Sequence, residues 1–170
     1  ELLDQPLEPE GSVLPTEEED SASIKNFSGN NAIELEGVSF SYNGTNKVLD
    51  GINLSIEKGK VTAVVGYSGS GKTTIFKLIC GFYLPQEGEV RIFGNKVDVS
   101  SVSKLRNFIS LVSQDIYLFP GTISENIGYG QLDTTREEIV RAAKTANIHD
   151  FIMSLPDGYE TYISGGSSLS

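Results

Sequence analysis

The stretch Val65-Gly66-Tyr67-Ser68-Gly69-Ser70-Gly71-Lys72-Thr73-Thr74 decides the fold of this 170-residue chain. It fills every fixed position of the phosphate-binding pattern G-x-x-x-x-G-K-[ST]. Its glycines, Gly66, Gly69 and Gly71, permit backbone angles that other residues avoid and leave main-chain N–H groups free to close on a polyphosphate. The stretch therefore predicts a nest of N–H donors that binds phosphate.

The side chains that follow the glycines complete this predicted site. Lys72 can reach the terminal phosphates as a point charge, and Thr73 can place its hydroxyl on the Mg²⁺ that bridges them. Thr74 can donate from the next position of a helix whose N-terminus carries a partial positive charge. The sequence thus predicts a site for a triphosphate with Mg²⁺.

The residues on either side of the loop give it the expected context. Before the loop, Val61-Thr62-Ala63-Val64-Val65 is a short β-branched apolar run that predicts a buried parallel strand. After it, Thr73 to Cys80 lacks Gly and Pro and carries apolar residues at helical spacing, which predicts a helix that ends at Gly81. Strand, loop and helix follow in the order that phosphate binding requires. The alternative is a glycine-rich turn without a ligand.

Composition and charge exclude several classes of protein. The net charge is −10, but residues 1–20 hold eight acids and no base, which leaves 15 acids against 13 bases elsewhere. Without a basic face, the chain has no electrostatic footprint for nucleic acid. The single cysteine, Cys80, cannot form an internal disulfide, and its apolar neighbours predict an inert buried thiol. No apolar run approaches the length of a membrane span and no signal peptide opens the chain, so we expect the polypeptide alone to be soluble.

Residues 1–31 are expected to form an extended, solvated linker. They contain three of the six prolines, an acidic run and an end rich in Ser, Asn and Gly. The first four residues, Glu1-Leu2-Leu3-Asp4, look like the end of a helix that begins upstream. We therefore expect the chain to be part of a longer one.

Two antiparallel strands are predicted before the parallel strand that leads into the loop. Apolar residues alternate with smaller or polar ones over residues 32–42 and again over 48–56, and a turn at 43–46 separates them. Tyr42 ends the first of these strands. It either stacks on an adenine ring or covers the sheet, and the pattern alone does not separate the two roles.

Three more elements are predicted after the loop helix. Residues 89–93 alternate like an edge strand, 102–107 form a short helix, and 108–112 form a second core strand. Gln114 follows the carboxyl end of that core strand, on the side where doubly wound sheets bind ligands. Its amide could contact a metal or a water, although a lone glutamine is more often a surface residue.

The last third of the chain is predicted to be mainly helical. A helical turn is expected at residues 122–127, and a helix with a thin apolar stripe, packed at the rim, is expected to run to about residue 147. Two overlapping capping boxes open that helix: Thr134 with Glu137, and Thr135 with Glu138. His149, the only histidine, has no acid, serine or second ligand around it, and we assign it no catalytic role. The end, rich in Gly and Ser, is expected to be loop.

Four stretches together resemble the nucleotide-binding domain of an ATP-binding cassette (ABC) transporter, of the exporter type whose membrane and ATPase parts share one chain. Phe40-Ser41-Tyr42 resembles the aromatic loop that stacks on adenine, and Gly66 to Thr74 is similar to the Walker A motif. Val112-Ser113-Gln114-Asp115 resembles the Q-loop. Leu118-Phe119-Pro120-Gly121-Thr122-Ile123-Ser124-Glu125-Asn126-Ile127 is similar to the exporter segment that follows the Q-loop.

The resemblance runs from about residue 33 to the end and implies an α/β fold, a P-loop NTPase of ABC type. Such a fold has a parallel core, an antiparallel β subdomain and a helical subdomain, of which only part is expected here because the carboxyl-terminal half is absent. Residues 1–31 would be the acidic linker from an upstream membrane domain, and residues 32–170 a partial nucleotide-binding domain.

The resemblance also implies a role for each matching residue. Tyr42 would stack on the adenine of ATP, and Gly66 to Gly71, with Ser68 and Ser70, would wrap its phosphates. Lys72 would bind the β- and γ-phosphates, with Thr74 beside it. Thr73 and Gln114 would share Mg²⁺ and its waters.

Partners and location follow from the same resemblance. The partners would be a transmembrane domain of the same parent chain and a second nucleotide-binding domain, whose signature motif closes the site. The chain would work at the cytoplasmic face of a membrane as part of an integral membrane transporter.

Some features of the family pattern are missing from the sequence. Leu169-Ser170 look like the first two residues of the LSGGQ signature, whereas Ile163-Ser164-Gly165-Gly166-Ser167 could be mistaken for a degenerate signature that lies earlier than expected. No later apolar strand ends in Asp-Glu, so the Walker B aspartate and the catalytic glutamate are missing. No switch histidine follows, and His149 precedes its place.

We therefore expect an amino-terminal fragment of an exporter ATPase. The parent protein would hydrolyse ATP to drive export, while the fragment, which lacks a general base, would bind ATP weakly or not at all and hydrolyse none. One alternative is a soluble ABC ATPase that acts in repair or assembly. Another is an inactive structural fragment that exposes a sheet edge and aggregates.

Overall fold

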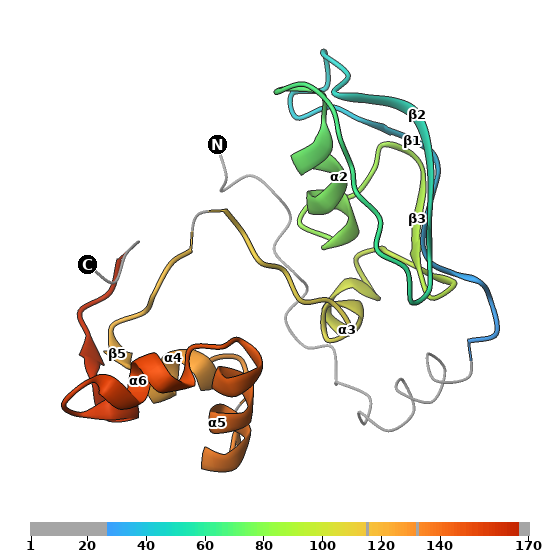
Figure 1. Ribbon diagram of the computed structural model, residues 1–170. Coiled ribbons are helices and arrows are strands. Elements are labelled where there is room, and N and C mark those ends of the chain that lie inside the picture. The colour runs from blue at the N-terminus through green and yellow to red at the C-terminus, as the bar shows by residue number, and fades with distance from the viewer. Residues whose placement is uncertain (1–26, 115, 132, 167–170) are drawn as a thin grey trace. The chain divides into compact units, whose positions relative to one another are not determined.

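A computed structural model of the chain describes residues 27–166, except 115 and 132. The chain divides into two compact units, Glu1–Leu111 and Val112–Ser170 (Figure 1), and each unit is described by itself. The predicted linker falls almost wholly outside the described residues, and so do Asp115 and the Leu169-Ser170 pair.

The first unit is built on a four-stranded antiparallel sheet. Its strands lie in the order β2-β1-β3-β4, and each neighbouring pair is antiparallel. Leu35, near the middle of β1, pairs with Leu54 of β2 on one side and with Val90 of β3 on the other. The two strands predicted before the loop, and their antiparallel pairing, are therefore confirmed. The strands are β1 (Asn31–Phe40), β2 (Leu49–Glu57), β3 (Glu87–Ile92) and β4 (Asn95–Lys96).

Strand β3 is not the edge strand that its alternation predicted. It lies between β1 and the two-residue strand β4. The chain reverses at Phe93 and Gly94, whose φ angles are 46° and 76°, and Asn95 then pairs with Ile92. The prediction was wrong because this tight turn returns the chain alongside the strand it has just left.

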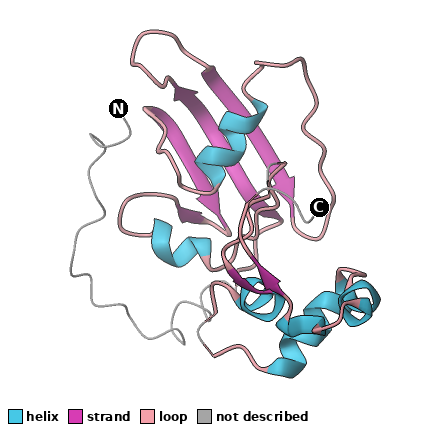
Figure 2. Ribbon diagram, turned by 90° about the vertical axis from the view of Figure 1, so that its left-hand side faces the viewer, coloured by secondary structure: helices cyan, strands magenta, loops and turns pink. Residues whose placement is uncertain are grey.

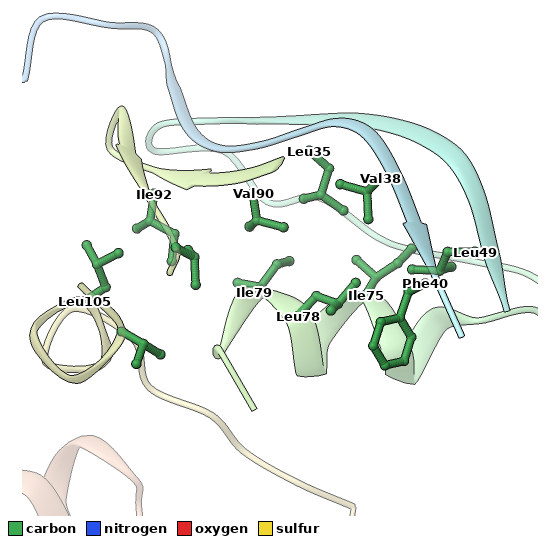
Figure 3. Packing of buried hydrophobic residues seen from close by; sticks show 12 residues of the cluster. Leu35, Val38, Phe40, Leu49, Ile75, Leu78, Ile79, Val90, Ile92 and Leu105 are labelled. Carbon is green, nitrogen blue, oxygen red and sulfur yellow. The ribbon is translucent and has the colours of Figure 1, made fainter. Parts of the chain in front are cut away.

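Helix α2 (Lys72–Ile79) lies across one face of this sheet (Figure 2). Its apolar side chains Ile75, Leu78 and Ile79 recur at helical spacing, so they share the face that the sheet buries. Figure 3 shows them meeting side chains of the strands. Each fully buried apolar side chain of this kind contributes about 1.5–3 kcal/mol of transfer free energy. The sheet residues of this core are Leu35, Val38, Phe40, Leu49, Val90 and Ile92.

Helix α2 ends as the sequence predicts. Gly81 takes a left-handed φ of 65°. Its N–H bonds to the carbonyl of Leu78 at 3.0 Å, and the N–H of Phe82 bonds to that of Lys77 at 2.9 Å. This is the Schellman arrangement, which satisfies the last carbonyls of a helix. The short helix α3 (Val102–Arg106) then adds Val102 and Leu105 to the same core.

The two predicted parallel strands are not formed in this structure. Residues 61–65 and 108–112 are irregular, and Val61, Val65 and Val112 are 101%, 86% and 86% exposed. An extended segment has no hydrogen bonds of its own and needs a neighbouring strand on at least one side. Among the described residues neither segment is paired with a strand, since the four-stranded sheet consists of β1 to β4 alone.

The second unit is a small helical layer closed by a two-stranded ribbon. Strands β5 and β6 pair antiparallel, and Leu118 and Gly166 form a further bridge beside them. The end of the chain was expected to be loop, and this pairing corrects that expectation for residues 162–166. The elements are β5 (Gly121–Thr122), α4 (Ile123–Gly128), α5 (Arg136–Thr145), α6 (His149–Ser154), the 3₁₀ helix η1 (Gly158–Glu160) and β6 (Tyr162–Ile163).

Helix α5 belongs to the core of this unit and not to its rim. Ile139 and Ala143 of α5 belong to one buried cluster with Ile123, Ile152 and Tyr159. The prediction was wrong because even a thin apolar stripe is buried when residues from several other elements pack around it. One of the two predicted capping boxes is formed, between Thr135 and Glu138. The hydroxyl of Thr134 instead donates to the carbonyl of Gln131 at 2.9 Å.

In the part of the chain that the structure describes, no helix combines the length and the apolar content needed to cross a bilayer.

Candidate functional site

The glycine loop leads directly into the N-terminus of α2. Gly71 is the N-cap of the helix, with a φ of 89°, and the carbonyl of Gly71 accepts from the N–H of Ile75 at 3.0 Å. The first N–H groups of a helix have no carbonyl partner within that helix. Those of Lys72, Thr73 and Thr74 therefore form the donor end of α2, where an anion is stabilised.

Two glycines of the loop lie where a side chain would force a neighbouring side chain to move. A Cβ on Gly66 would lie 2.7 Å from Oγ of Ser70, and one on Gly71 would lie 2.6 Å from Cδ2 of Leu49. Gly69 has a φ of 81°, which side chains rarely adopt. The geometry agrees with the sequence argument that these glycines allow close backbone approach. The loop residues present fit a bound phosphate chain.

Lys72 bridges the loop that precedes it. Its Nζ donates to the carbonyls of Gly66 at 2.8 Å and Tyr67 at 2.6 Å, and it lies 3.4 Å from Oγ of Ser70. Charged donors make shorter and stronger hydrogen bonds than neutral ones. The ammonium group thus holds the loop in a closed turn and places a positive charge next to the helix N-terminus.

The two threonines after Lys72 differ in their surroundings. Thr73 is exposed, whereas Thr74 is only 4% exposed. The Oγ1 atom of Thr74 lies 3.1 Å from Oη of Tyr42, in hydrogen-bond contact. The hydroxyl of Thr74 is therefore engaged with Tyr42, while its main-chain N–H remains at the donor end of α2.

Tyr42 lies beside the loop helix although it is 32 residues from Thr74. Its ring is 48% exposed and meets the rings of Phe40 and Tyr83 edge-on, with centroids 4.9 Å and 5.2 Å away. Nζ of Lys77 lies over the Tyr42 ring, 5.3 Å from its centroid. The Tyr42 ring is thus held by neighbouring side chains and is still partly exposed, so a nucleobase could stack on it.

Gln114 lies in the second unit and is exposed. Thr73 lies in the first unit, so the predicted Mg²⁺ site shared by these two residues stays a prediction. Within the described residues, no three His, Cys, Asp or Glu side chains gather as a metal site. The donors available at the loop itself are hydroxyl groups.

The sequence and the fold were then compared with known proteins. The model of the ABC transporter family matches residues 49–168, which is well over half of the chain. The chain belongs to the ABC transporter family. This membership confirms the resemblance found in the motifs, and it implies ATP binding.

Individual relatives of this ABC transporter chain include bacterial proteins that are described as transporter or export proteins. A Mycoplasma genitalium protein described as an ABC transporter ATP-binding protein is 49% identical over 152 residues, 86% of this chain and 25% of that protein. A Staphylococcus aureus protein described as a multidrug export ATP-binding/permease protein is 48% identical over 132 residues, 77% of this chain and 23% of that protein.

A solved structure supports the fold. The structure of a bacterial Atm1-family ABC exporter with ATP bound matches with a TM-score of 0.75 at 38% identity, covering 80% of this chain and 24% of that one. The predicted fold class, a P-loop NTPase of ABC type, is thereby confirmed. The chain spans about a quarter of the length of each of these proteins.

Sequence reasoning missed three residues of this ABC transporter chain that surround Tyr42. Lys77 follows Thr73 and Thr74 by one helical turn, a spacing that could have indicated it. Tyr83 carried no signal. Gln86 was treated only as part of a turn, but its side chain bonds to both backbone groups of Ser41, at 2.6 Å and 2.7 Å. It therefore fixes the backbone immediately before Tyr42.

The surroundings of His149 and Cys80, both discussed from the sequence, indicate that these residues have structural roles. Nδ1 of the half-buried His149 lies 2.8 Å from Oη of Tyr159, which is buried in the core of the second unit. Cys80 is only 6% exposed, and burial raises the pKa of its thiol, with Arg106 acting weakly in the opposite direction. The prediction of a buried thiol is confirmed.

Proposed function

We propose that this chain is the ATP-binding part of an ABC exporter, in which ATP binding and hydrolysis drive transport across a membrane. One observation carries the proposal: Lys72 bridges a glycine loop whose residues fit phosphate, at the N-terminus of α2. Similarity to proteins described as a multidrug export ATP-binding/permease protein and an Atm1-family exporter supports the exporter reading.

Each residue of the site has a distinct role in this proposal. The backbone N–H groups from Gly66 to Gly71, with Ser68 and Ser70 among them, bind the phosphates of ATP. Lys72 neutralises the charge of the β- and γ-phosphates and, with Thr74 next to it, belongs to the donor end of α2. Tyr42 stacks on the adenine. Thr73 and Gln114 hold Mg²⁺ and its waters. Bound Mg²⁺ supplies further neutralisation of the phosphate charge.

The chain alone is proposed to bind ATP weakly and to hydrolyse none. Hydrolysis requires a group that positions the attacking water. Within the 170 residues, no apolar strand after the loop ends in Asp-Glu, and Nδ1 of His149 is in hydrogen-bond contact with Oη of Tyr159. Hydrolysis would therefore need residues that this sequence does not contain.

The wider assembly is part of the same proposal. The partners are a transmembrane domain of the same parent chain and a second nucleotide-binding domain, and the site lies on the cytoplasmic face of the membrane. Residues 1–31 form the linker and residues 32–170 the partial nucleotide-binding domain. In support of this boundary, the first described strand begins at Asn31.

Nucleotide titration tests the proposal. We expect a fluorescent N-methylanthraniloyl derivative of ATP to bind in the presence of Mg²⁺ and to be displaced by ATP. Lys72→Ala should abolish this binding because it removes the charge beside the phosphates. Lys144→Ala, at an exposed lysine in the last turn of α5, removes the same charge elsewhere and should leave binding unchanged.

Two results would contradict the proposal. Equal binding by the wild type and by Lys72→Ala would remove the role of the loop. Release of inorganic phosphate from ATP by the purified chain, lost in Lys72→Ala, would show that hydrolysis needs no further residues.

A further inference from the structure

We propose that Thr74 is a positioning residue for nucleobase recognition, which holds the Tyr42 ring through its side-chain hydroxyl. Lys77 and Tyr83 complete the support. The base platform is thereby attached to the same helix that binds the phosphates. This inference rests on the proposed ATP-binding function and assigns the Thr74 hydroxyl to the base end of the nucleotide instead of the phosphate end.

The hydrogen bond between Tyr42 and Thr74 is the first observation. Oη of Tyr42 lies 3.1 Å from Oγ1 of Thr74, and Thr74 is 4% exposed. A buried hydroxyl needs a partner, since an unsatisfied one is destabilising. Tyr42 is that partner, so the orientation of its ring is tied to the first turn of α2.

Ring contacts fix Tyr42 from other directions. Its ring stands at 88° to that of Phe40 and at 90° to that of Tyr83, and Phe40 and Tyr83 are themselves 5.5 Å apart. Edge-to-face pairs of this kind are favourable beyond the area that they bury. A tyrosine side chain has two rotatable angles, so these contacts together with the hydrogen bond leave the ring little freedom.

Lys77 determines which face of the Tyr42 ring a base can use. Its Nζ lies over the ring at 5.3 Å from the centroid, and it also lies 5.7 Å from the centroid of Tyr83. A cation in this position is attracted to the negative face of an aromatic ring. A nucleobase would therefore stack on the opposite face of Tyr42, which is 48% exposed overall.

The two threonines serve different ends of the nucleotide: Thr73 serves the phosphates and the Thr74 hydroxyl serves the base. Thr73 is exposed beside the loop, and Thr74 is turned to Tyr42. Fixing the ring in advance lowers the conformational freedom that a base must remove when it stacks. Removing the Thr74 hydroxyl should then weaken base stacking alone, because the main-chain N–H of residue 74 stays in place.

The test compares ATP with inorganic tripolyphosphate, each with Mg²⁺. Both ligands contain three linked phosphates, and only ATP carries the nucleoside with its base. Their affinities for the full chain are measured by displacement of the fluorescent nucleotide. Thr74→Val keeps the β-branched shape and removes the hydroxyl. We expect it to weaken ATP binding about threefold to tenfold, as loss of one neutral hydrogen bond predicts. We expect tripolyphosphate binding to be unchanged.

Four further variants extend the comparison. Tyr42→Phe removes the other half of the hydrogen bond and should weaken ATP binding by the same factor. The double variant should show no further loss, because both changes break one interaction. Thr74→Ser keeps the hydroxyl and should bind ATP as the wild type does. Thr73→Val should weaken both ligands together.

Parallel loss of ATP and tripolyphosphate binding in Thr74→Val would overturn the inference and return the hydroxyl to the phosphates. Unchanged ATP binding in both Thr74→Val and Tyr42→Phe would overturn it as well. If the wild type binds neither ligand, the proposed function itself fails and this inference falls with it. Tyr42→Phe changes a half-exposed ring, so it keeps the test valid if Thr74→Val does not fold.

Discussion

At the scale of single residues, Gly71 of the glycine loop has little room for a side chain. Its φ is 89°, and an added Cβ would lie 2.6 Å from Cδ2 of Leu49 and 3.2 Å from the carbonyl oxygen of Val48. A left-handed conformation alone costs a non-glycine residue about 1–2 kcal/mol. Gly71→Ala should therefore lower the free energy of unfolding of the first unit by more than that amount, as measured by urea denaturation.

Gly44 provides a matched control for this prediction. Its φ is 74°, but nothing lies within 4 Å of the place where its Cβ would be. Gly44→Ala should show the conformational cost without the clash. Equal losses of stability in the two variants would mean that the contact with Leu49 has no effect.

At the scale of elements, α5 depends on its N-terminal cap. The hydroxyl of Thr135 accepts from the N–H of Glu138 at 3.3 Å, and the Glu138 carboxylate accepts from the N–H of Thr135 at 2.9 Å. Thr135→Ala should lower the free energy of unfolding of the second unit by about 1 kcal/mol. The loss can be measured from the urea midpoint of the helical circular dichroism signal.

Thr134→Ala tests whether the cap is specific. Thr134 was predicted to form an overlapping capping box, but its hydroxyl bonds to Gln131 instead. Its replacement should affect α5 less than that of Thr135. A larger loss in Thr134→Ala would contradict the assignment of the cap.

The turn that precedes α3 should make stability depend on pH. Oδ1 of Asp98 accepts from the hydroxyl of Ser100 at 2.7 Å and from the N–H groups of Ser100 and Ser101 at 2.9 Å each. These bonds, that of the Ser100 hydroxyl foremost, lower the pKa of Asp98 from its ordinary value of 3.8. The ionised carboxylate therefore stabilises the fold at pH values above 3.8, and this contribution is lost as the pH falls through the lowered pKa.

Comparison with Asp98→Ala isolates this contribution from the other carboxyl groups. The difference in urea midpoint between wild type and variant should be constant from pH 7 to about pH 5 and should shrink below about pH 4. A difference that grows as the pH falls would mean that the pKa of Asp98 is raised in the folded chain.

At the scale of the whole molecule, local patterns were predicted well and long-range partners were not. The glycine loop, the Schellman end of α2 and the cap at Thr135 depend on neighbours within a few residues, so the sequence contains all that they need. The parallel strands at 61–65 and 108–112 depend on strands from elsewhere. Their apolar composition indicated burial, but composition does not provide a hydrogen-bonding neighbour.

The candidate site likewise contains local contacts, which the sequence predicts, and long-range contacts, which it does not. The residues of the glycine loop are consecutive in the sequence, so they lie close together whatever the rest of the chain does. Contact between Tyr42 and Thr74 requires β1 to end beside α2, and this depends on how the sheet packs against the helix. Tyr83 contacts the Tyr42 ring and Gln86 bonds to the backbone of Ser41, although both residues are more than 40 positions away in the sequence. No local pattern marks such residues, which explains why sequence reasoning missed them.

Hydrogen exchange tests the state of the two unpaired segments. Amides without a hydrogen-bond partner exchange at rates near those of unfolded chains, whereas those of a paired strand need an opening event. We expect fast exchange at residues 61–65 and 110–112 and slow exchange at Leu35 and Val38 of β1. Residues 108 and 109 are left out because their N–H groups bond to the carbonyls of Leu105 and Arg106. Protection at Val61 to Val65 equal to that of β1 would show that they are paired after all.

The hydrogen bonds that Lys72 makes to its own loop determine which anions can bind to its ammonium group. To follow a phosphate, the ammonium group has to exchange the carbonyls of Gly66 and Tyr67 for anionic oxygens. A singly charged anion competes poorly with two carbonyls, whereas a chain of phosphates brings several charges at once. Small monovalent anions of the solvent, such as chloride, should therefore leave the lysine where it is, and only a densely charged ligand should draw it away.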